Sequence, residues 1–388
     1  RLDGEAATNF AGYNLGAAGD VNGDGFDDIL IGADGHDPGG RTNAGTGYVV
    51  FGKASGWTSN VLLSSLDGTS GMQWEGIDGS DRAGASLNRV GDMNGDGFED
   101  FIIGSYRGDP GGDLDAGEAY VVFGKNSGWV ANDILSSLNG TTGFRLDGID
   151  ASDFTGRAVS AAGDVNGDGL ADLIIGAYRA DPGGDSDAGE SFVVFGKTTA
   201  FASSLDLSTL DGTNGYRLDG KDAVDRAGRA VGTVGDINGD GFDEIVIGAY
   251  AADPVGGTSG ETYIIFGKAS GYGSSFDLTT INGTNGFRLT GAASGDQSGF
   301  SVSGAGDYNG DGLGDILIGA READPSALTS AGNSYIIFGK TTAYAAAIGL
   351  GSLNGTDGLV LNGVDGLDRS GTSVSAAGDV NGDGYDDV

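Results

Sequence analysis

The feature that most constrains this chain is a nine-residue acidic motif that recurs six times at a nearly constant interval. Each copy is a variant of Asp-x-Asn-Gly-Asp-Gly-x-x-Asp. The copies are separated by 72, 72, 72, 71 and 72 residues, and they begin at Asp20, Asp92, Asp164, Asp236, Asp307 and Asp379. Six copies in one register indicate a repeat protein in which each repeat is one structural unit.

The residue types in the motif are those of a calcium-binding loop. In the first copy, positions 1, 3, 5, 7 and 9 are Asp20, Asn22, Asp24, Phe26 and Asp28. Four of them offer side-chain oxygens, the residue at position 7 offers its carbonyl, and glycine at position 6 allows the sharp turn. Hard oxygen ligands at this alternation suit Ca²⁺ better than Zn²⁺ or a redox metal. The alternative is an acidic hairpin turn that binds no metal.

The same five positions give the predicted ligands of every loop, about one Ca²⁺ per repeat and up to six in all. Five loops have Asp at position 9, whereas the fourth has Glu244, which is one methylene longer and departs most from the pattern. The predicted metal ligands are Asp20, Asn22, Asp24, Phe26, Asp28, Asp92, Asn94, Asp96, Phe98, Asp100, Asp164, Asn166, Asp168, Leu170, Asp172, Asp236, Asn238, Asp240, Phe242, Glu244, Asp307, Asn309, Asp311, Leu313, Asp315, Asp379, Asn381, Asp383, Tyr385 and Asp387.

The residues that follow the motif exclude an EF-hand. An EF-hand needs a bidentate Glu at position 12, between two helices. Position 12 is Ile31 in the first copy, inside the apolar run 28–33, and Ile103 in the second. Short β-branched runs bounded by glycine predict buried strands, so the ninth residue is expected to begin a strand. The interval of about 72 residues also excludes tandem nonapeptide repeats.

Each repeat is predicted to contain four antiparallel strands. In the third repeat these are 157–163, 173–177, 190–196 and 216–220. The first strand consists of small residues, and the later strands carry bulky and aromatic ones. This layout predicts an all-β protein whose repeats are the four-stranded blades of a β-propeller.

The repeat boundaries divide the chain into five complete blades and a partial one. We expect residues 1–388 to form a single propeller fragment of six or seven blades. The predicted blades are approximately 11–76, 83–148, 155–220, 227–291 and 298–363, with a partial blade at 370–388 and residues 1–4 as a possible closing fourth strand.

The composition limits the classes of binding partner and the cellular compartment that we expect for this chain. Acidic residues number 56 and basic residues 20, which gives a formal charge of −36. Six Ca²⁺ ions would add twelve positive charges and leave −24. No basic stripe is present, so a nucleic-acid partner is not expected. Cysteine is absent, and no apolar run is long enough for a transmembrane segment. These properties favour an extracellular or cell-surface location, where calcium is abundant.

One aromatic residue recurs at the repeat period between the third and fourth strands. These residues are Trp57, Trp129, Phe201, Tyr272 and Tyr344. Such periodicity favours packing between blades over ligand stacking.

The segment Gly156 to Ala177 carries the pattern Gly-x-x-Val-Ser-x-x-Gly-Asp-x-Asn-Gly-Asp-Gly-x-x-Asp-x-x-Ile-Gly-Ala. This pattern resembles the FG-GAP repeat of the integrin α-subunit β-propeller, in a form similar to that of large bacterial secreted or surface proteins. The Phe-Gly element is altered, since Phe300 follows Gly299, and the Gly-Ala element lacks its proline. The resemblance implies a propeller with Ca²⁺ in the loops between first and second strands.

Several functional interpretations follow. Near-identical blades favour a calcium-stabilised extracellular propeller with an adhesive, matrix or surface-structural role, with a protein or carbohydrate partner. The alternative is an accessory or lectin-like module of a larger secreted hydrolase that binds carbohydrate. Catalysis by this chain is not expected, because the carboxylates repeat as ligands. The single histidine, His36, is expected to be a surface loop residue, so a catalytic triad has no support.

The tripeptide Arg107-Gly108-Asp109 matches the sequence that integrins bind in their ligands. Its counterpart in the next repeat is Arg179-Ala-Asp181. We therefore interpret the tripeptide as a chance variant within a polar loop.

Overall fold

The computed structural model describes residues 1–388, which fold into β-strands and short 3₁₀ helices. Strand β13 (Asp172–Ala177) shows why strands form where they do. Its β-branched and leucine side chains are buried throughout, as suits an interior strand of a sheet. The predicted strands at 157–163, 190–196 and 216–220 are confirmed as β12 (Ala158–Gly163), β14 (Glu190–Val194) and β16 (Gly215–Asp219).

The chain divides into two compact units. The first comprises Arg1–Ala161, Leu170–Ala177 and Val194–Leu210, and the second comprises Ala162–Gly169, Tyr178–Val193 and Asp211–Val388.

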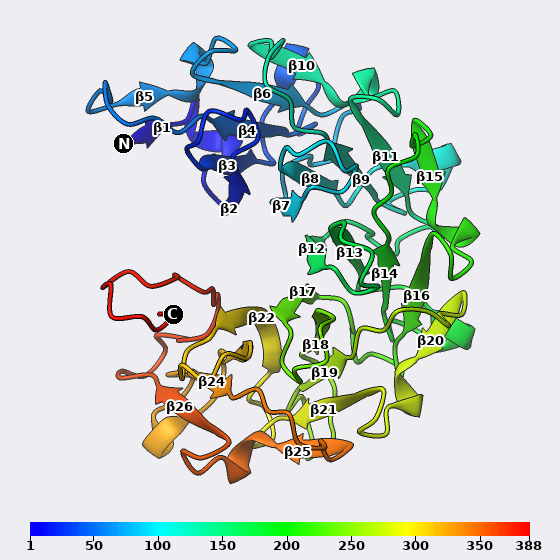
Figure 1. The fold of residues 1–388 in the computed structure, drawn as a ribbon, viewed down its shortest axis with the longest axis vertical. Coiled ribbons are helices and arrows are strands. Elements are labelled where there is room, and N and C mark those ends of the chain that lie inside the picture. Colours follow the sequence, from blue (N-terminus) through cyan, green and yellow to red (C-terminus); the bar gives the residue numbers. More distant parts are fainter. The chain divides into compact units, whose positions relative to one another are not determined.

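Two complete sheets belong to the first unit. One has the order β10-β6-β4-β3-β2, and the other has the order β15-β11-β9-β8-β7. Figure 1 shows β2, β3 and β4 side by side. The strands of the two sheets are β2 (Asn14–Gly19), β3 (Asp28–Ala33), β4 (Thr46–Val50), β6 (Gly71–Glu75), β10 (Asn132–Ile134), β7 (Ser86–Gly91), β8 (Asp100–Ser105), β9 (Glu118–Val122), β11 (Gly143–Asp147) and β15 (Ser204–Asp206).

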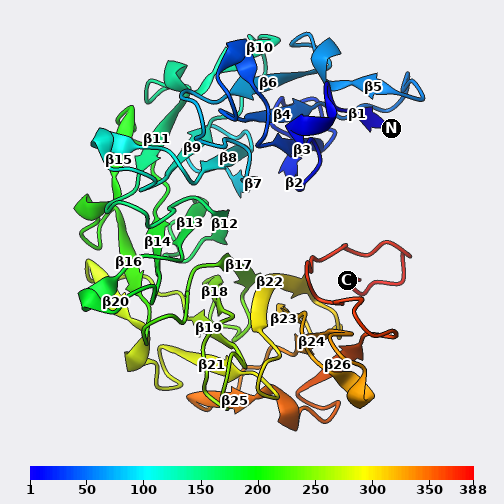
Figure 2. The same ribbon diagram turned by 180° about the vertical axis from the view of Figure 1, so that it is seen from behind.

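Two further sheets belong to the second unit, with the orders β17-β18-β19-β21-β25 and β22-β23-β24-β26. The second of these sheets is labelled in full in Figure 2. Their strands are β17 (Ala230–Gly235), β18 (Glu244–Ala249), β19 (Glu261–Ile265), β21 (Gly286–Thr290), β25 (Ala347–Gly349), β22 (Ser298–Gly306), β23 (Asp315–Ala320), β24 (Asn333–Ile337) and β26 (Gly358–Asn362). The remaining five-stranded sheet has the order β12-β13-β14-β16-β20, with β20 at Ser275–Asp277.

The connection between the third and fourth strands of a repeat holds a strand that the sequence pattern did not predict. In the second repeat this strand is β10, which pairs in parallel with β6, the fourth strand of the first repeat. The same pairing joins β15 to β11, β20 to β16 and β25 to β21. Each of the first four blades therefore gains a fifth, parallel strand from the following repeat, whereas the sheet β22-β23-β24-β26 has four strands.

Short 3₁₀ helices follow these added strands and also occupy the loops after the second strands, and one more, η1, lies between β1 and β2. They are η1 (Ala7–Asn9), η2 (Pro38–Gly40), η3 (Leu63–Ser65), η4 (Pro110–Gly112), η5 (Leu135–Ser137), η6 (Pro182–Gly184), η7 (Leu207–Thr209), η8 (Leu278–Thr280), η9 (Pro325–Ala327) and η10 (Leu350–Ser352). No helix in the chain is both long enough and apolar enough to cross a membrane.

The two chain ends behave differently. Strand β1 (Leu2–Asp3) pairs in parallel with β5 (Val61–Leu62), which is the relation between a fourth strand and an added strand elsewhere. The role of residues 1–4 as a closing fourth strand stays a prediction. The predicted strands of the partial blade at 370–388 do not form: this segment has two isolated bridges, one between Gly378 and Asp387 and one between Ser370 and Gly332.

The recurring aromatics pack on the preceding blade, as expected. Phe201 stacks on Phe144 of β11 with ring centroids 4.5 Å apart. Tyr344 stacks on Phe287 of β21 at 4.2 Å. Trp57 is the exception and is 48 % exposed. The buried core of each blade thus continues into the next, which is how a repeat protein completes cores that single repeats leave open.

The glycine near the end of each second strand marks a close approach between successive repeats. A Cβ added at Gly104 would lie 2.1 Å from the carbonyl oxygen of Gly156. The equivalent distances from Gly32 to Gly84 and from Gly319 to Gly371 are both 2.0 Å. Backbone cannot yield as a flexible side chain can, so only glycine fits at these positions.

Substitution of one such glycine should therefore loosen the contact between neighbouring blades. We expect Gly104→Ala to lower the free energy of unfolding by about 1–3 kcal/mol, the usual cost of overpacking. Gly79→Ala is the matched control, since its added Cβ would lie 3.4 Å from the nearest atom, an ordinary contact. Urea unfolding followed by circular dichroism measures both, and equal effects of the two substitutions would contradict the close-approach explanation.

Candidate metal centres

In every acidic loop the carboxylate at position 1 accepts hydrogen bonds from backbone N–H groups of the same loop. In the first loop Asp20 Oδ1 accepts N–H hydrogen bonds from Gly23 and Asp24 at 2.7 and 3.0 Å, and Oδ2 accepts one from Gly25 at 2.8 Å. Gly25 has φ +88°, the left-handed conformation expected at position 6. The sixth loop repeats this set with Asp379 as acceptor, although it is not flanked by strands. The loop conformation is therefore a local property of the motif.

The carboxylate at position 9 lies at the start of the second strand and is buried. Asp100 is fully buried, and its two oxygens accept N–H hydrogen bonds from Met93 and Gly124, each at 2.9 Å. Asp28 and Asp315 have the same two kinds of donor. Burial raises the pKa of Asp100 to about 8 and that of Asp28 to about 7. A cation beside these carboxylates would offset the desolvation that produces this shift.

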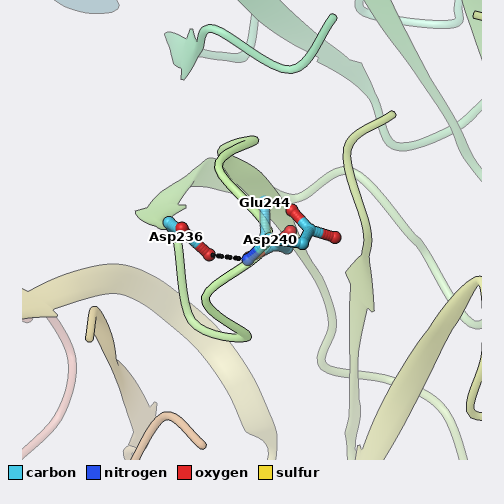
Figure 3. A group of neighbouring side chains, drawn as sticks. All are labelled: Asp236, Asp240 and Glu244. Carbon is cyan, nitrogen blue, oxygen red and sulfur yellow. Dashed lines mark hydrogen bonds between the residues drawn. The ribbon is translucent and has the colours of Figure 1, made fainter. Parts of the chain in front are cut away.

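The fourth loop brings three carboxylates together. Asp236, Asp240 and Glu244 offer oxygen atoms that all lie within 4.8 Å of one another, and Figure 3 shows them around one turn of the loop. Asp236 Oδ1 accepts the N–H of Asp240 at 3.2 Å. Burial, with a smaller contribution from the charges of Asp240 and Asp236, raises the pKa of Glu244 to about 8. None of the three forms an ion pair with Lys or Arg. Convergent like charges without a basic partner are a chemical fit to a bound cation.

The predicted ligands of the other loops are placed less closely. No group of three carboxylates within the same limit forms in those five loops. Asp100 at position 9 accepts two backbone N–H groups at the strand start, and Glu244 Oε2 likewise accepts the N–H of Ile237 at 2.8 Å, although its side chain is one methylene longer. The loop whose sequence departs most from the pattern is thus the one with the closest carboxylates. Asn238 Nδ2 adds a hydrogen bond to Glu244 Oε1 at 3.0 Å.

Backbone hydrogen bonds join each acidic loop to the next repeat, a link the motif alone did not reveal. The carbonyl of Val21, at position 2, accepts the N–H of Lys125 at 2.9 Å. Position 2 of the second, third and fourth loops accepts N–H groups from Lys197, Lys268 and Lys340 in the same way. Position 1 is also used, because the carbonyl of Asp92 accepts the N–H of Ala171 at 3.0 Å. In the sequence, the only sign of this link is the lysine that recurs after each Phe-Gly.

The side chain at position 7 packs against the preceding loop. Phe98 Cε1 lies 2.5 Å from the point where a Cβ on Gly23 would stand, and Phe242 covers Gly167 in the same way. The predicted metal ligand at position 7 is the carbonyl oxygen, and this role stays a prediction. Its side chain has a separate role in holding successive loops together.

A second set of buried carboxylates lies at the opposite ends of the strands. Asp81, Asp153, Asp225 and Asp296 precede the first strands and are only 5–7 % exposed. Asp81 Oδ2 accepts the N–H of Asp78 at 3.0 Å, and burial raises the pKa of Asp81 and of Asp225 to about 7. Their spacing was readable in the sequence, but their burial was not, since a lone Asp before a strand usually faces solvent.

His36 and the tripeptide 107–109 both lie in packed loops. His36 is half-buried rather than solvated, with Nδ1 2.7 Å from Thr46 Oγ1 and Nε2 3.4 Å from Glu5. In the tripeptide 107–109, Asp109 Oδ1 accepts the N–H of Asp115 at 2.7 Å, so the aspartate is held by its own loop.

Comparison with known proteins identifies the repeat. A sequence model of the FG-GAP repeat matches residues 11–50, 88–122, 155–194, 227–265 and 298–337, together half of the chain. The chain belongs to the FG-GAP repeat family. Each matched FG-GAP segment contains one of the first five acidic loops in full, and the sixth loop lies outside these segments. The resemblance to integrin α-subunits and the β-propeller fold class are thereby confirmed.

Curated relatives of this FG-GAP chain include integrin subunits. It is 28 % identical over 279 residues to integrin alpha pat-2 of Caenorhabditis elegans, covering 68 % of this chain and 20 % of that protein. It is 30 % identical over 245 residues to integrin alpha-V of Gallus gallus, covering 62 % and 20 %. It is 34 % identical over 173 residues to phosphatidylinositol-glycan-specific phospholipase D of Rattus norvegicus, covering 45 % and 19 %. The chain spans about a fifth of the length of these relatives.

The raised pKa values predict how the metal-free FG-GAP chain responds to pH. Asp100 and Glu244 keep a proton in the folded state up to about pH 8, whereas in the unfolded state they lose it near pH 4. The folded state therefore binds more protons across this window, and its stability falls as the pH rises. Each such group contributes a slope of about 1.4 kcal/mol per pH unit.

We expect the urea midpoint in EDTA to decrease steadily from about pH 5 to about pH 8. Asp100→Asn should flatten the curve, because the amide cannot titrate. A midpoint that rises with pH in EDTA would show that the buried carboxylates are ionised without metal and would overturn this prediction.

Proposed function

We propose that this chain is an extracellular calcium-binding β-propeller with an adhesive or surface-structural role, in which Ca²⁺ makes each blade rigid. The observation that carries the proposal is the group Asp236, Asp240 and Glu244, three carboxylates within 4.8 Å and without a basic partner. The oxygen ligands at positions 1, 3, 5, 7 and 9 of all six loops are the proposed sites. Carboxylate oxygens have two lone pairs, so an oxygen that accepts an N–H can still bind a cation.

Calcium would supply charge neutralisation at the points where successive repeats join. The carbonyls of positions 1 and 2 accept N–H groups from the next repeat, as Val21 does from Lys125. A cation that fixes the loop also fixes these acceptors. Binding energy then becomes folding energy, about 2.7 kcal/mol per site when Ca²⁺ is one hundred times its dissociation constant. Loops of this kind stay filled only where calcium is abundant, which supports an extracellular location.

The adhesive role is supported by the relatives named as integrin α-subunits. The similarity to a phosphatidylinositol-glycan-specific phospholipase D supports a second candidate, an accessory or lectin-like module of a larger secreted hydrolase. Neither proposal assigns catalysis to these repeats. In both, the propeller presents a surface that calcium holds rigid.

Calorimetric titration with Ca²⁺ and thermal unfolding test the calcium proposal directly. We expect a stoichiometry near six and a rise of the melting temperature of at least about 10 °C over EDTA-treated protein, since several sites each add a few kcal/mol. One or two bound ions with little stabilisation would mean that the loops are mostly bare acidic turns, and the proposal would fail.

Asp240→Asn tests a single site without breaking its turn. Asp240 Oδ1 accepts the N–H of Phe242 at 3.1 Å, and the Asn side chain keeps this acceptor while removing the charge. We expect the stoichiometry to fall by one, or one site to weaken at least about tenfold. Asp277→Asn is the matched control, because Asp277 accepts the N–H of Thr279 in an ordinary turn outside the loops. An unchanged titration with Asp240→Asn would remove the fourth loop from the proposed sites.

A further inference from the structure

Two arginines lack a carboxylate partner in a chain where acidic residues outnumber basic ones 56 to 20. Arg107 and Arg157 form no ion pair, and both instead lie over the ring of Tyr106, with guanidinium carbons 5.7 and 5.5 Å from its centroid. Most other arginines are paired, as Arg82 is with Asp34 at 3.3 Å. A guanidinium without a counter-ion leaves its charge uncompensated, and a bound anion would compensate it.

A pocket of about 260 Å³ lies beside these arginines, within the first unit. Phe10, Tyr13 and Tyr106 form its aromatic lining, and Asp34, Arg82 and Arg157 its charged lining. These residues precede first strands or follow second strands, so the pocket lies at the ends of the strands opposite the acidic loops. Three successive repeats contribute to it.

The local charge of the pocket is positive. Its single carboxylate, Asp34, is compensated by Arg82, which leaves the charge of Arg157 without a partner. A guanidinium binds a carboxylate through two parallel hydrogen bonds, a geometry that lysine cannot match. The charged wall therefore suits a ligand carboxylate.

The aromatic wall is exposed but held in place. Phe10 is 55 % and Tyr13 is 73 % exposed, and large apolar rings at this exposure often mark a binding surface. Phe10 has φ +56°, and its ring rests against Gly35, where an added Cβ would lie 2.7 Å from Cδ2. Tyr106 packs edge-on against Phe154 at 5.6 Å. Rings fixed in this way lose little freedom when a ligand binds.

We propose that this pocket binds an acidic sugar, a hexuronate whose ring lies against the aromatic wall and whose carboxylate pairs with Arg157. A pyranose ring offers an apolar C–H face of the size of one aromatic ring, and a pocket of this volume holds one such ring. The inference goes beyond the calcium-binding role and does not use the acidic loops. Loss of calcium binding in Asp240→Asn and loss of sugar binding are therefore separate results.

The test is calorimetric titration of the calcium-loaded chain with sodium glucuronate, with glucose and sodium acetate as comparison ligands. Glucose lacks the carboxylate and acetate lacks the ring, so both should bind at least about tenfold more weakly than glucuronate. Arg157→Gln should weaken glucuronate at least about tenfold, the usual loss for a bidentate charged hydrogen bond. Arg89→Gln is the matched control, since it removes the same charge from the ion pair with Glu99, outside the pocket, and should leave binding unchanged.

Thermal unfolding of Arg157→Gln confirms that the variant is folded, and Tyr13→Ala, at an exposed ring, gives a second independent variant that should also weaken binding. The proposal is overturned if glucuronate gives no saturable binding, or if Arg157→Gln binds as the parent chain does. Equal binding of acetate and glucuronate would also overturn it, because the site would then hold any small anion. A tighter affinity for polygalacturonate than for glucuronate would place the natural sugar within a polymer.

Discussion

The structure depends on the backbone hydrogen bonds that tie each acidic loop to the following repeat. The carbonyl of Val21 accepts from Lys125, and that of Ile237 accepts from Lys340 in the same way. The nine-residue motif therefore sets two things at once: the positions of its own carboxylates and the position of the next blade. A change in loop conformation cannot stay local, because it moves acceptors that a neighbouring repeat uses. This double use explains why the loops are nearly identical while the connections between other strands vary.

Different interactions hold successive repeats together at the two ends of the strands. At the loop end, carboxylates crowd together, and their mutual repulsion and desolvation must be offset by protons or by a cation. At the other end, backbone meets backbone directly, as at Gly104 and Gly156, and needs no charge. Arginine and aromatic side chains also gather there, over Tyr106 in the first unit and over Phe300 in the second, beside the buried carboxylates that precede the first strands. The repeats can thus vary their chemistry at one end without disturbing the loops at the other.

Most of the blade was predictable because its signals are local. Glycine at position 6 and the apolar run after position 9 specify a turn followed by a strand, and the structure begins β3 and β8 at Asp28 and Asp100. Strand β10 was not predictable, because Asn132–Ile134 is a strand only through parallel pairing with β6 of the preceding repeat. The convergence on Glu244 was missed for a related reason. Whether the side chain at position 9 reaches the other carboxylates depends on the buried backbone N–H groups that hold it, as they hold Asp100. The sequence does not show these N–H groups.

The charge of the chain connects these observations to function. Repulsion among 56 acidic groups opposes compaction, and each acidic loop brings several of these groups close together. Without a cation, protonation reduces this repulsion, and burial, aided by the neighbouring carboxylates, raises the pKa of Asp100 and Glu244 to about 8. A divalent ion would replace those protons and neutralise more charge in the same volume. Under the proposed function, the calcium concentration around the protein would then set the rigidity of the blades, while the proposed ligand of Arg157 would bind at the opposite ends of the strands.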